Sequence, residues 1–298
     1  MRKPRVNARR CARALGMTAA LLLCACGADD SSPGDAVDDT PDAAAAPAES
    51  IEARPSESPE PSSSASADAS AAAQGFDAIV SAPDRTDADR ALDAGRHPAE
   101  LLAFIGVERG MRVAEIAAGG GYTTELLTRA VGPEGKVYGQ NSPALLERFL
   151  EEPWSTRLQR PVMQAVERLD RSFEDPFPAE LRDLDRVVNV LFYHDLVWIG
   201  TDRAALNRAV FEALRPGGAY VIVDHSAREG SGVNDVQTLH RIEESVVKSE
   251  VEAAGFKLAK SADFLREPAD TRDWNASPRE AGERRGESDR FVLRFVKP

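Results

Sequence analysis

The segment from Arg112 to Tyr122 joins an acid, a glycine-rich loop and the start of a helix, and this arrangement could bind a ligand through the backbone. A short apolar run carries Glu115 near its end, glycines occupy positions 119–121, and a helical pattern begins at Tyr122. Glycine lets the main chain turn with positive φ and approach a ligand closely, and the free N–H groups at a helix start attract polar or anionic groups. The Glu115 carboxylate could accept hydrogen bonds from an amine or a hydroxyl. The alternative is a tight turn with a purely structural role.

The sequence on both sides of this loop alternates between predicted strands and predicted helices. Such alternation is typical of a parallel sheet covered by helices on both faces. The last two strands have no helix between them, which predicts an antiparallel hairpin. We therefore expect an α/β fold: a doubly wound, mostly parallel seven-stranded sheet with a C-terminal antiparallel hairpin. The predicted strands are 111–116, 135–139, 166–169, 185–192, 219–223, 256–261 and 290–296, and the main predicted helices are 123–130, 144–149, 204–214 and 239–254.

In such a sheet, ligands bind beyond the carboxyl ends of the strands, at the point next to the first strand where the strand order reverses. The loop 117–121 lies at that point. Residues 84–107 precede the first strand and are predicted to form two helices, with Pro98 in the first turn of the second. The charges clustered on them suit either a solvated helix face or a lid over the site. We assign 76–298 to one domain, with 76–110 as its N-terminal helical lid.

Residues 1–25 resemble the signal peptide of a bacterial lipoprotein. They carry six basic residues and no acid, and the apolar run 17–23 is too short to span a bilayer. The run ends in Leu23, Cys24, Ala25 and Cys26, which is similar to the lipoprotein cleavage box. The resemblance implies that Cys26 becomes the lipidated first residue of the mature protein. Residue 27 is glycine, and by the same resemblance this favours the outer membrane. We expect a lipoprotein of the cell envelope, on the outer membrane or the periplasmic face, or a cytoplasmic protein if the signal peptide is not used. A plain signal peptide with an incidental cysteine is the alternative.

Residues 26–75 are mostly Ala, Ser, Pro, Asp and Glu, and they contain almost no large apolar side chains. Such a segment cannot bury enough surface to offset its chain entropy, which predicts a disordered acidic tether. Without the six basic residues of the signal peptide the formal charge is −18; the tether carries −10 of it, which leaves −8 on the domain. An acidic domain argues against a nucleic-acid substrate.

All three cysteines precede residue 27, so the domain has no disulfide, thiolate metal site or cysteine nucleophile.

From about residue 85 onward, the chain resembles the class I S-adenosylmethionine-dependent methyltransferases. The family's first motif is an acid followed by three glycines at alternate positions, and the residues here are Glu115, Ala117, Gly119 and Gly121. The turn 215–218, of sequence Arg-Pro-Gly-Gly, and the terminal hairpin are also similar to the family. The short motifs at 96–98, 193–195 and 224–226 are similar to a narrower bacterial group of methyltransferases, predicted from sequence and often exported. The resemblance implies S-adenosylmethionine as the cofactor and a small molecule as the methyl acceptor.

The same resemblance implies a set of cofactor-binding residues. Asn141 stands where the family has an acid that bridges the two ribose hydroxyls, and Ser172, followed by Phe173, stands where it has the acid that binds the adenine amine. An amide lacks the charge-assisted hydrogen bond of an acid, so we expect Asn141→Asp to tighten cofactor binding. The cofactor-binding candidates are Glu115, Ala117, Gly119, Gly121, Tyr122, Asn141, Ser172 and Phe173.

Three polar side chains that follow the fourth and fifth predicted strands are the candidate catalytic groups. His194 and Asp195 follow one strand and His225 follows the other, and both strand ends face the expected cofactor crevice. An unperturbed imidazole pKa of about 6.5 suits a general base near neutral pH. Structural hydrogen bonding is the alternative for each. We do not expect a metal site, because adjacent residues on a strand point to opposite faces.

Two other functions compete with methyl transfer. A lipid-tethered, non-catalytic domain of the same fold, binding an adenosine-like or other small ligand, would account for Ala117, Asn141 and Ser172 at the motif positions. A nicotinamide-dependent oxidoreductase is expected to carry Gly-x-Gly-x-x-Gly and an acid at the end of the second strand. Residues 119–122 match that pattern poorly.

Overall fold

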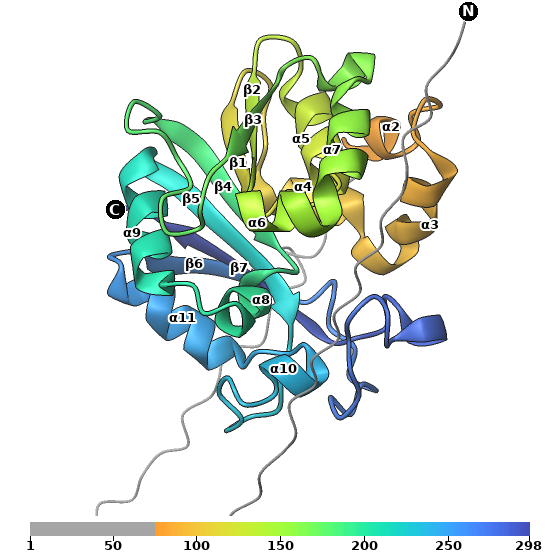
Figure 1. The fold of residues 1–298 in the computed structure, drawn as a ribbon, viewed down its shortest axis with the longest axis vertical. Coiled ribbons are helices and arrows are strands. Elements are labelled where there is room, and N and C mark those ends of the chain that lie inside the picture. The colour runs from red at the N-terminus through yellow and green to blue at the C-terminus, as the bar shows by residue number, and fades with distance from the viewer. Residues whose placement is uncertain (1–74) are drawn as a thin grey trace, which may run out of the picture. The chain divides into compact units, whose positions relative to one another are not determined.

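A computed structural model of the chain describes residues 75–298, which form a seven-stranded sheet with helices on both faces (Figure 1). The strand order is β3-β2-β1-β4-β5-β7-β6. The first five strands pair in parallel, and β7 runs antiparallel to both of its neighbours. The predicted fold class, including the C-terminal antiparallel hairpin, is therefore confirmed. The strands are β1 (Arg112–Ile116), β2 (Lys136–Asn141), β3 (Val166–Asp170), β4 (Leu184–Val190), β5 (Leu214–His225), β6 (Lys257–Ala262) and β7 (Arg290–Val296).

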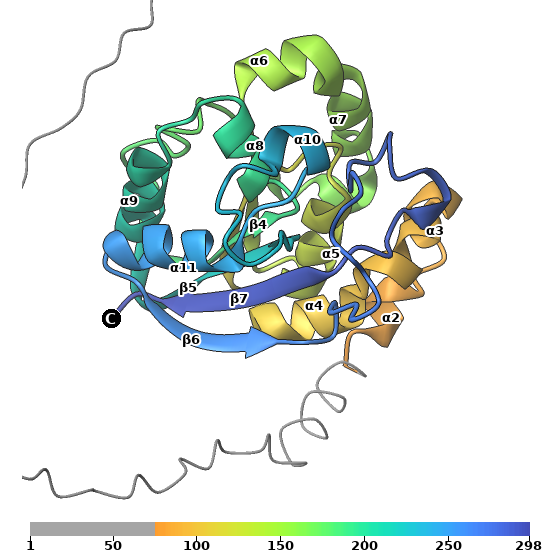
Figure 2. The same cartoon turned by 90° about the horizontal axis from the view of Figure 1, so that it is seen from below.

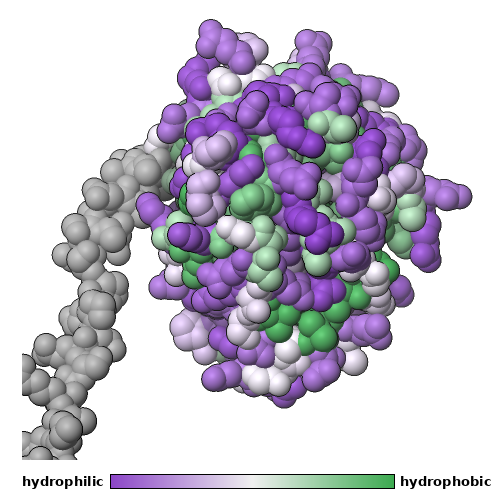
Figure 3. Space-filling view, turned by 90° about the vertical axis from the view of Figure 1, so that its left-hand side faces the viewer, coloured by the Kyte–Doolittle hydropathy of each residue, from purple (hydrophilic) through white to green (hydrophobic). Residues whose placement is uncertain are grey.

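The helices form two layers, one on each face of the sheet (Figure 2). Helices α4 and α5 pack on one face, and α9 and α11 pack on the other. The outer surface that Figure 3 presents is mostly hydrophilic, with hydrophobic side chains in smaller groups. The helices are α2 (Asp77–Val80), α3 (Asp87–Arg96), α4 (Pro98–Ile105), α5 (Tyr122–Val131), α6 (Pro143–Leu145), η1 (Leu146–Leu150), α7 (Glu151–Leu158), η2 (Pro161–Met163), α8 (Tyr193–Trp198), α9 (Arg203–Ala213), α10 (Val236–Leu239), α11 (Glu244–Ala253) and η3 (Gly282–Arg284).

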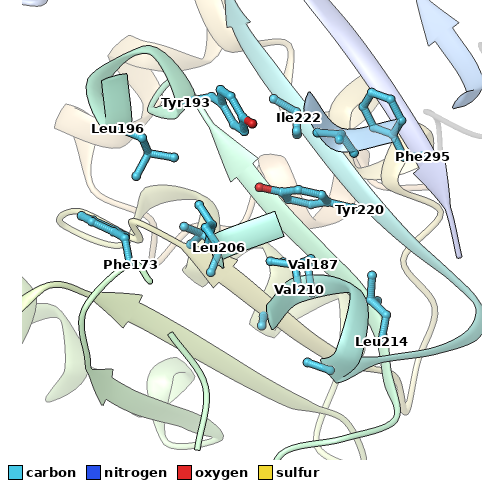
Figure 4. Close-up of a cluster of buried hydrophobic side chains, with 14 of the residues drawn as sticks. Phe173, Val187, Tyr193, Leu196, Leu206, Val210, Leu214, Tyr220, Ile222 and Phe295 are labelled. Carbon is cyan, nitrogen blue, oxygen red and sulfur yellow. The ribbon is translucent and has the colours of Figure 1, made fainter. Parts of the chain in front are cut away.

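The central strands are apolar on both faces because both faces are covered. Successive side chains of a strand point to opposite sides, so Val187 of β4 packs with α9 and Val188 packs with α4 and α5. Figure 4 shows the first of these layers, in which Val187 and Tyr220 of the sheet meet Leu206 of α9. Near-continuous apolar runs of this kind are typical of a buried parallel sheet. The site is therefore built on a rigid core.

Two differences from the sequence prediction concern the site. Residues 193–198, which follow the predicted strand 185–192, form the helix α8, and the predicted helix 239–254 is divided into α10 and α11. Between these two helices the chain pairs with the segment after β5, through the bridge between Ser226 and Ile242. Both differences place polar residues at the carboxyl ends of β4 and β5.

No helix within residues 75–298 is long and apolar enough to cross a membrane. The predicted signal peptide, the lipidated Cys26 and the acidic tether lie outside the residues that the structure describes, apart from residue 75 at the tether's end.

Candidate functional site

A cavity of about 440 Å³ lies at the carboxyl ends of β1, β4 and β5, where the sequence predicts the ligand site. Its volume is in the range of small-molecule sites. On one side it is lined by the glycine loop and on another by a group of histidines. Helix α3, part of the predicted lid, contributes Asp89, Leu92 and Arg96 to the wall. The remaining lining residues include Glu115, Ala117, Gly119, Gly120, Tyr122, Pro153, Arg157, Leu191, His194, Asp195, His225, His240 and Pro278.

The glycine loop is held in place by two buried amide side chains at the end of β2. Asn141 accepts a hydrogen bond from the Gly119 N–H at 2.9 Å and donates one to the Gly119 carbonyl at 3.1 Å. Gln140 accepts a bond from the Ala117 N–H at 3.2 Å. Both amides are fully buried and do not line the cavity. The structure therefore places the Asn141 side chain on the loop and away from the cavity wall, where the resemblance implies a contact with the ribose.

Three other cofactor-binding candidates also lie away from the cavity wall. Gly121 is packed beneath the loop against Trp154, where an added Cβ would lie 2.6 Å from the indole ring. Phe173 belongs to the hydrophobic core and its ring lies 5.2 Å from that of Phe192. Ser172 is exposed to solvent after β3. None of the three residues lines this cavity.

Glu115 reaches the cavity from the end of β1 and is almost completely buried. It accepts a hydrogen bond from the hydroxyl of Thr124 in α5. Burial raises the pKa of the Glu115 carboxyl to about 7, against the opposing effects of the threonine hydroxyls and of Arg96. Near neutral pH this group can therefore change charge when a cation binds beside it.

Helix α3 is fixed over the cavity by ion pairs. Arg157 of α7 binds the Asp89 carboxylate at 2.7 and 2.9 Å. The Tyr122 hydroxyl donates to Asp93 at 2.6 Å.

Arg96 lies with its guanidinium 4.6 Å from the centre of the Tyr122 ring, and it has no hydrogen bond or ion pair with any residue of the described domain. Burial lowers the pKa of Arg96, as expected for a cation without a carboxylate partner.

On the histidine side, His194 and Asp195 lie in the first turn of α8. The buried Asp224 of β5 accepts hydrogen bonds from the backbone N–H of His194 at 2.7 Å and from its Nδ1, also at 2.7 Å. The Nε2 of His194 lies 3.2 Å from Nδ1 of His240. Burial alone would lower the pKa of His194, but the Asp224 carboxylate raises it above its ordinary value.

His225 and His240 have the opposite charge preference. Burial, together with the nearby His194, lowers the pKa of His225 well below its ordinary value. The same causes lower the pKa of His240 to about 4. Nδ1 of His225 lies 2.7 Å from the Ser288 hydroxyl, and this contact leaves the Nε2 atom of His225 unused. Both rings are therefore neutral near pH 7.

The three predicted catalytic residues His194, Asp195 and His225 are brought together in the cavity with Glu115, Ala117, Gly119 and Tyr122 of the predicted cofactor site. Sequence reasoning missed His240 and did not assign a role to Arg96. His240 was placed at the start of a predicted long helix, and no local signal indicated that the chain would turn there. Arg96 did stand in one of the motifs that carried the resemblance, next to His97 and Pro98, and that signal could have identified it.

Comparison with known proteins places the chain by fold. No family model matches the sequence, and no curated protein matches it either. Among solved structures, the fold is similar to an S-adenosylmethionine-dependent methyltransferase from Aquifex aeolicus, with 17% identity, a TM-score of 0.50, and coverage of 67% of this chain and 89% of that one. It is also similar to the 4+2 cyclase SpnF, with 14% identity, a TM-score of 0.52, and coverage of 69% and 81%. A likeness at this identity establishes a methyltransferase-like fold, and the cyclase illustrates that one fold can serve different reactions.

Proposed function

We propose that this protein is an S-adenosylmethionine-dependent methyltransferase that acts on a small molecule. The observation that carries the proposal is that one cavity joins the glycine loop and Glu115 to a cluster of polar side chains on α8, β5 and α10. A methyl donor and a methyl acceptor must meet in one enclosed space for in-line transfer. The likeness of the fold to the Aquifex aeolicus enzyme supports the same reading.

The residues of the cavity fit the methionine end of S-adenosylmethionine, which carries an ammonium and a carboxylate. Arg96 is a partly buried cation with no hydrogen-bond or ion-pair partner in the described domain, so it suits the carboxylate. Glu115 is a buried acid that suits the ammonium, and the Gly119–Gly120 backbone lines the wall between strand and helix. The ribose would find no acid at the end of β2, because Asn141 there binds the loop.

When bound, the cofactor supplies a methyl group on a sulfonium that is already activated for displacement. The protein positions the acceptor and excludes water. His225 lines the cavity, and its contact with Ser288 is made through Nδ1, so we assign its Nε2 as a hydrogen-bond partner that positions the acceptor. Helix α3, fixed by the Arg157–Asp89 pair, covers the site and limits the entry of water.

The experiment is calorimetric titration of the purified chain with S-adenosylhomocysteine, comparing Gly119→Val with Gly232→Val. Both glycines have nearly the same backbone conformation, with φ of +58° and +57°, and neither has another atom closer than 4.0 Å to an added Cβ. The backbone strain of the two variants is therefore matched, but only Gly119 lines the cavity. We expect Gly119→Val to lose binding and Gly232→Val to bind as the wild type does.

Equal binding by both variants would place the ligand elsewhere and contradict the proposal. Binding without methyl transfer to any small molecule would instead favour the non-catalytic, ligand-binding role.

We further propose that the domain acts at the cell envelope as a lipoprotein anchored through Cys26, and that it belongs with the exported bacterial group that its short motifs resemble. The support is the basic and then apolar N-terminus that ends in Leu23, Cys24, Ala25 and Cys26.

A further inference from the structure

Two imidazoles and a carboxylate, carried by α8 and by the end of α10, meet at the wall of the cavity. His194 and Asp195 come from α8, and His240 follows the last residue of α10. Nε2 of His194 lies 3.2 Å from Nδ1 of His240, and Oδ1 of Asp195 lies 3.5 Å from each of these nitrogens. All three side chains line the cavity.

These three distances suit the ligand atoms of one metal ion. Zn²⁺ binds imidazole nitrogen and carboxylate oxygen at about 2.0–2.2 Å in a tetrahedral arrangement, which separates neighbouring ligand atoms by about 3.3–3.6 Å. The observed separations of 3.2 and 3.5 Å match one face of such a tetrahedron within a few tenths of an ångström. Because the three residues line the cavity, the fourth position is open to it.

The surroundings of His194 orient it for such a role. Asp224 accepts the Nδ1 proton of His194, which leaves the Nε2 lone pair directed at the cluster. A carboxylate that holds the outer nitrogen of a histidine is the usual support of a metal ligand, since it fixes the tautomer and the ring orientation. Asp224 is itself fixed by the backbone N–H groups of His194 and His225. Together, Asp195 and Asp224 balance the charge of a divalent cation.

Hydrogen bonding alone explains the cluster less well. The two histidines could share one hydrogen bond at 3.2 Å, but the Asp195 carboxylate makes no hydrogen bond with any residue from 75 to 298. The left-handed backbone of His240, with φ of +51°, follows from its position as the C-cap of α10. A bound cation would account for the unbonded carboxylate.

We propose that His194, Asp195 and His240 bind a divalent transition-metal ion, with Zn²⁺ as the first candidate. Imidazole ligands favour Zn²⁺, Fe²⁺, Ni²⁺ or Cu²⁺ over Mg²⁺ and Ca²⁺, and three protein ligands with an open fourth position are typical of catalytic zinc. The expectation from sequence that no metal binds here assumed that 194 and 195 lie on a strand. They lie in a helix instead, so that assumption does not hold.

One extension rests on the proposed function. If the cavity supports methyl transfer, the open position of the ion is where the acceptor would bind, and an ion there lowers the pKa of a bound hydroxyl. The acceptor class would then be a small molecule with a hydroxyl group. The metal site itself does not depend on this extension.

The test is a titration of the full, chelator-treated chain with Zn²⁺ alone, followed by calorimetry and by competition with a chromogenic chelator. Because Cys11, Cys24 and Cys26 could also bind zinc, every chain in the series carries Cys→Ser at these positions. We expect one Zn²⁺ to bind per chain. His240→Ala and Asp195→Ala should each lower the Zn²⁺ affinity by about a hundredfold or more. Removing the residue that hydrogen-bonds a metal ligand typically costs 10–100-fold, and removing the ligand itself should cost more.

His97→Ala is the matched control, because His97 is the one histidine that lies outside the cavity. It should bind zinc as the cysteine-free parent does. Failure of the parent to bind Zn²⁺, or undiminished binding by His240→Ala with its fold intact by circular dichroism, would overturn the proposal. These titrations contain no S-adenosylhomocysteine, so their failure would leave the proposed methyl transfer standing.

Discussion

At the scale of single residues, Asn141 marks where a resemblance and a structure assign different roles to one side chain. The resemblance placed its amide on the ribose, at a position where the family carries an acid. In the folded domain the amide donates to the Gly119 carbonyl and accepts from the Gly119 N–H. An acid can do only the second of these, because a carboxylate has no proton to donate. The residue type therefore fits the loop better than an aspartate would.

We accordingly expect Asn141→Asp to destabilise the protein rather than to tighten cofactor binding. The substitution removes one hydrogen bond and leaves the Gly119 carbonyl facing a buried carboxylate, at a cost of about 1–3 kcal/mol. Urea denaturation should report a lower free energy of unfolding. Asn275→Asp is the control, because Asn275 makes the same pair of bonds, to the Thr238 carbonyl and the Ser277 N–H, in a more exposed place. Similar losses in both variants would contradict this account of Asn141.

Glu115 gives a prediction for the dependence of stability on pH. Burial raises the pKa of this carboxyl from 4.5 to about 7 in the folded chain. Between these values the folded state holds a proton that the unfolded state releases, so the free energy of unfolding falls as pH rises through this range. The loss amounts to about 3 kcal/mol at about 1.4 kcal/mol per pH unit.

Glu115→Gln should remove this loss, because glutamine does not titrate. Urea denaturation at pH 5 and at pH 7.5 would therefore show the variant gaining stability relative to the wild type at the higher pH. A difference between the two proteins that stays constant with pH would mean that Glu115 is ionised in both folded and unfolded chains.

At the scale of elements, the sequence was sufficient where local pattern decides structure. The apolar runs of β4 and β5 and the glycine at position 121 placed the central strands and the start of α5 correctly. The segment 215–218 was correctly interpreted as the stop signal of the preceding helix, since α9 ends at Ala213, but it belongs to β5, which begins at Leu214 rather than at the predicted residue 219. These signals lie within a few residues of the feature that they determine.

The elements that carry the histidines were harder to predict, because distant residues decide them. The first turn of α8 is held by Asp224, which accepts the His194 N–H from a strand 30 residues later in the chain. The predicted helix at 239–254 is broken because Ile242 exchanges backbone bonds with His225 and Ala227 beside β5. Neither partner can be identified from the neighbouring sequence. The metal-binding geometry of His194 and His240 was hidden for the same reason.

At the scale of the whole molecule, the strand order explains why many of the predicted site residues line one cavity. The chain leaves β1 toward β2 on one side, and β4 joins β1 on the other, so the loops after β1 and β4 separate at the carboxyl edge of the sheet. Such a switch point leaves a crevice for a ligand. The glycine loop and the start of α8 lie on its two sides and line one cavity. Topology therefore brings together motifs that are more than 70 residues apart.

The place where the molecule acts gives the last prediction. A single acyl chain anchors a protein only marginally, so stable attachment to a membrane needs more than one. The resemblance to lipoproteins implies several acyl chains on Cys26, which would hold the mature protein on a membrane. Cys26→Ala should therefore move the protein from the membrane fraction to the soluble fraction in a bacterial host. Cys11→Ser serves as the control, because it changes a thiol that lies outside the cleavage box and should leave the distribution unchanged. Intact mass would show whether residues 1–25 have been removed. Equal soluble fractions for all three proteins, with residues 1–25 retained, would contradict export and would favour the cytoplasm as the place where the protein acts.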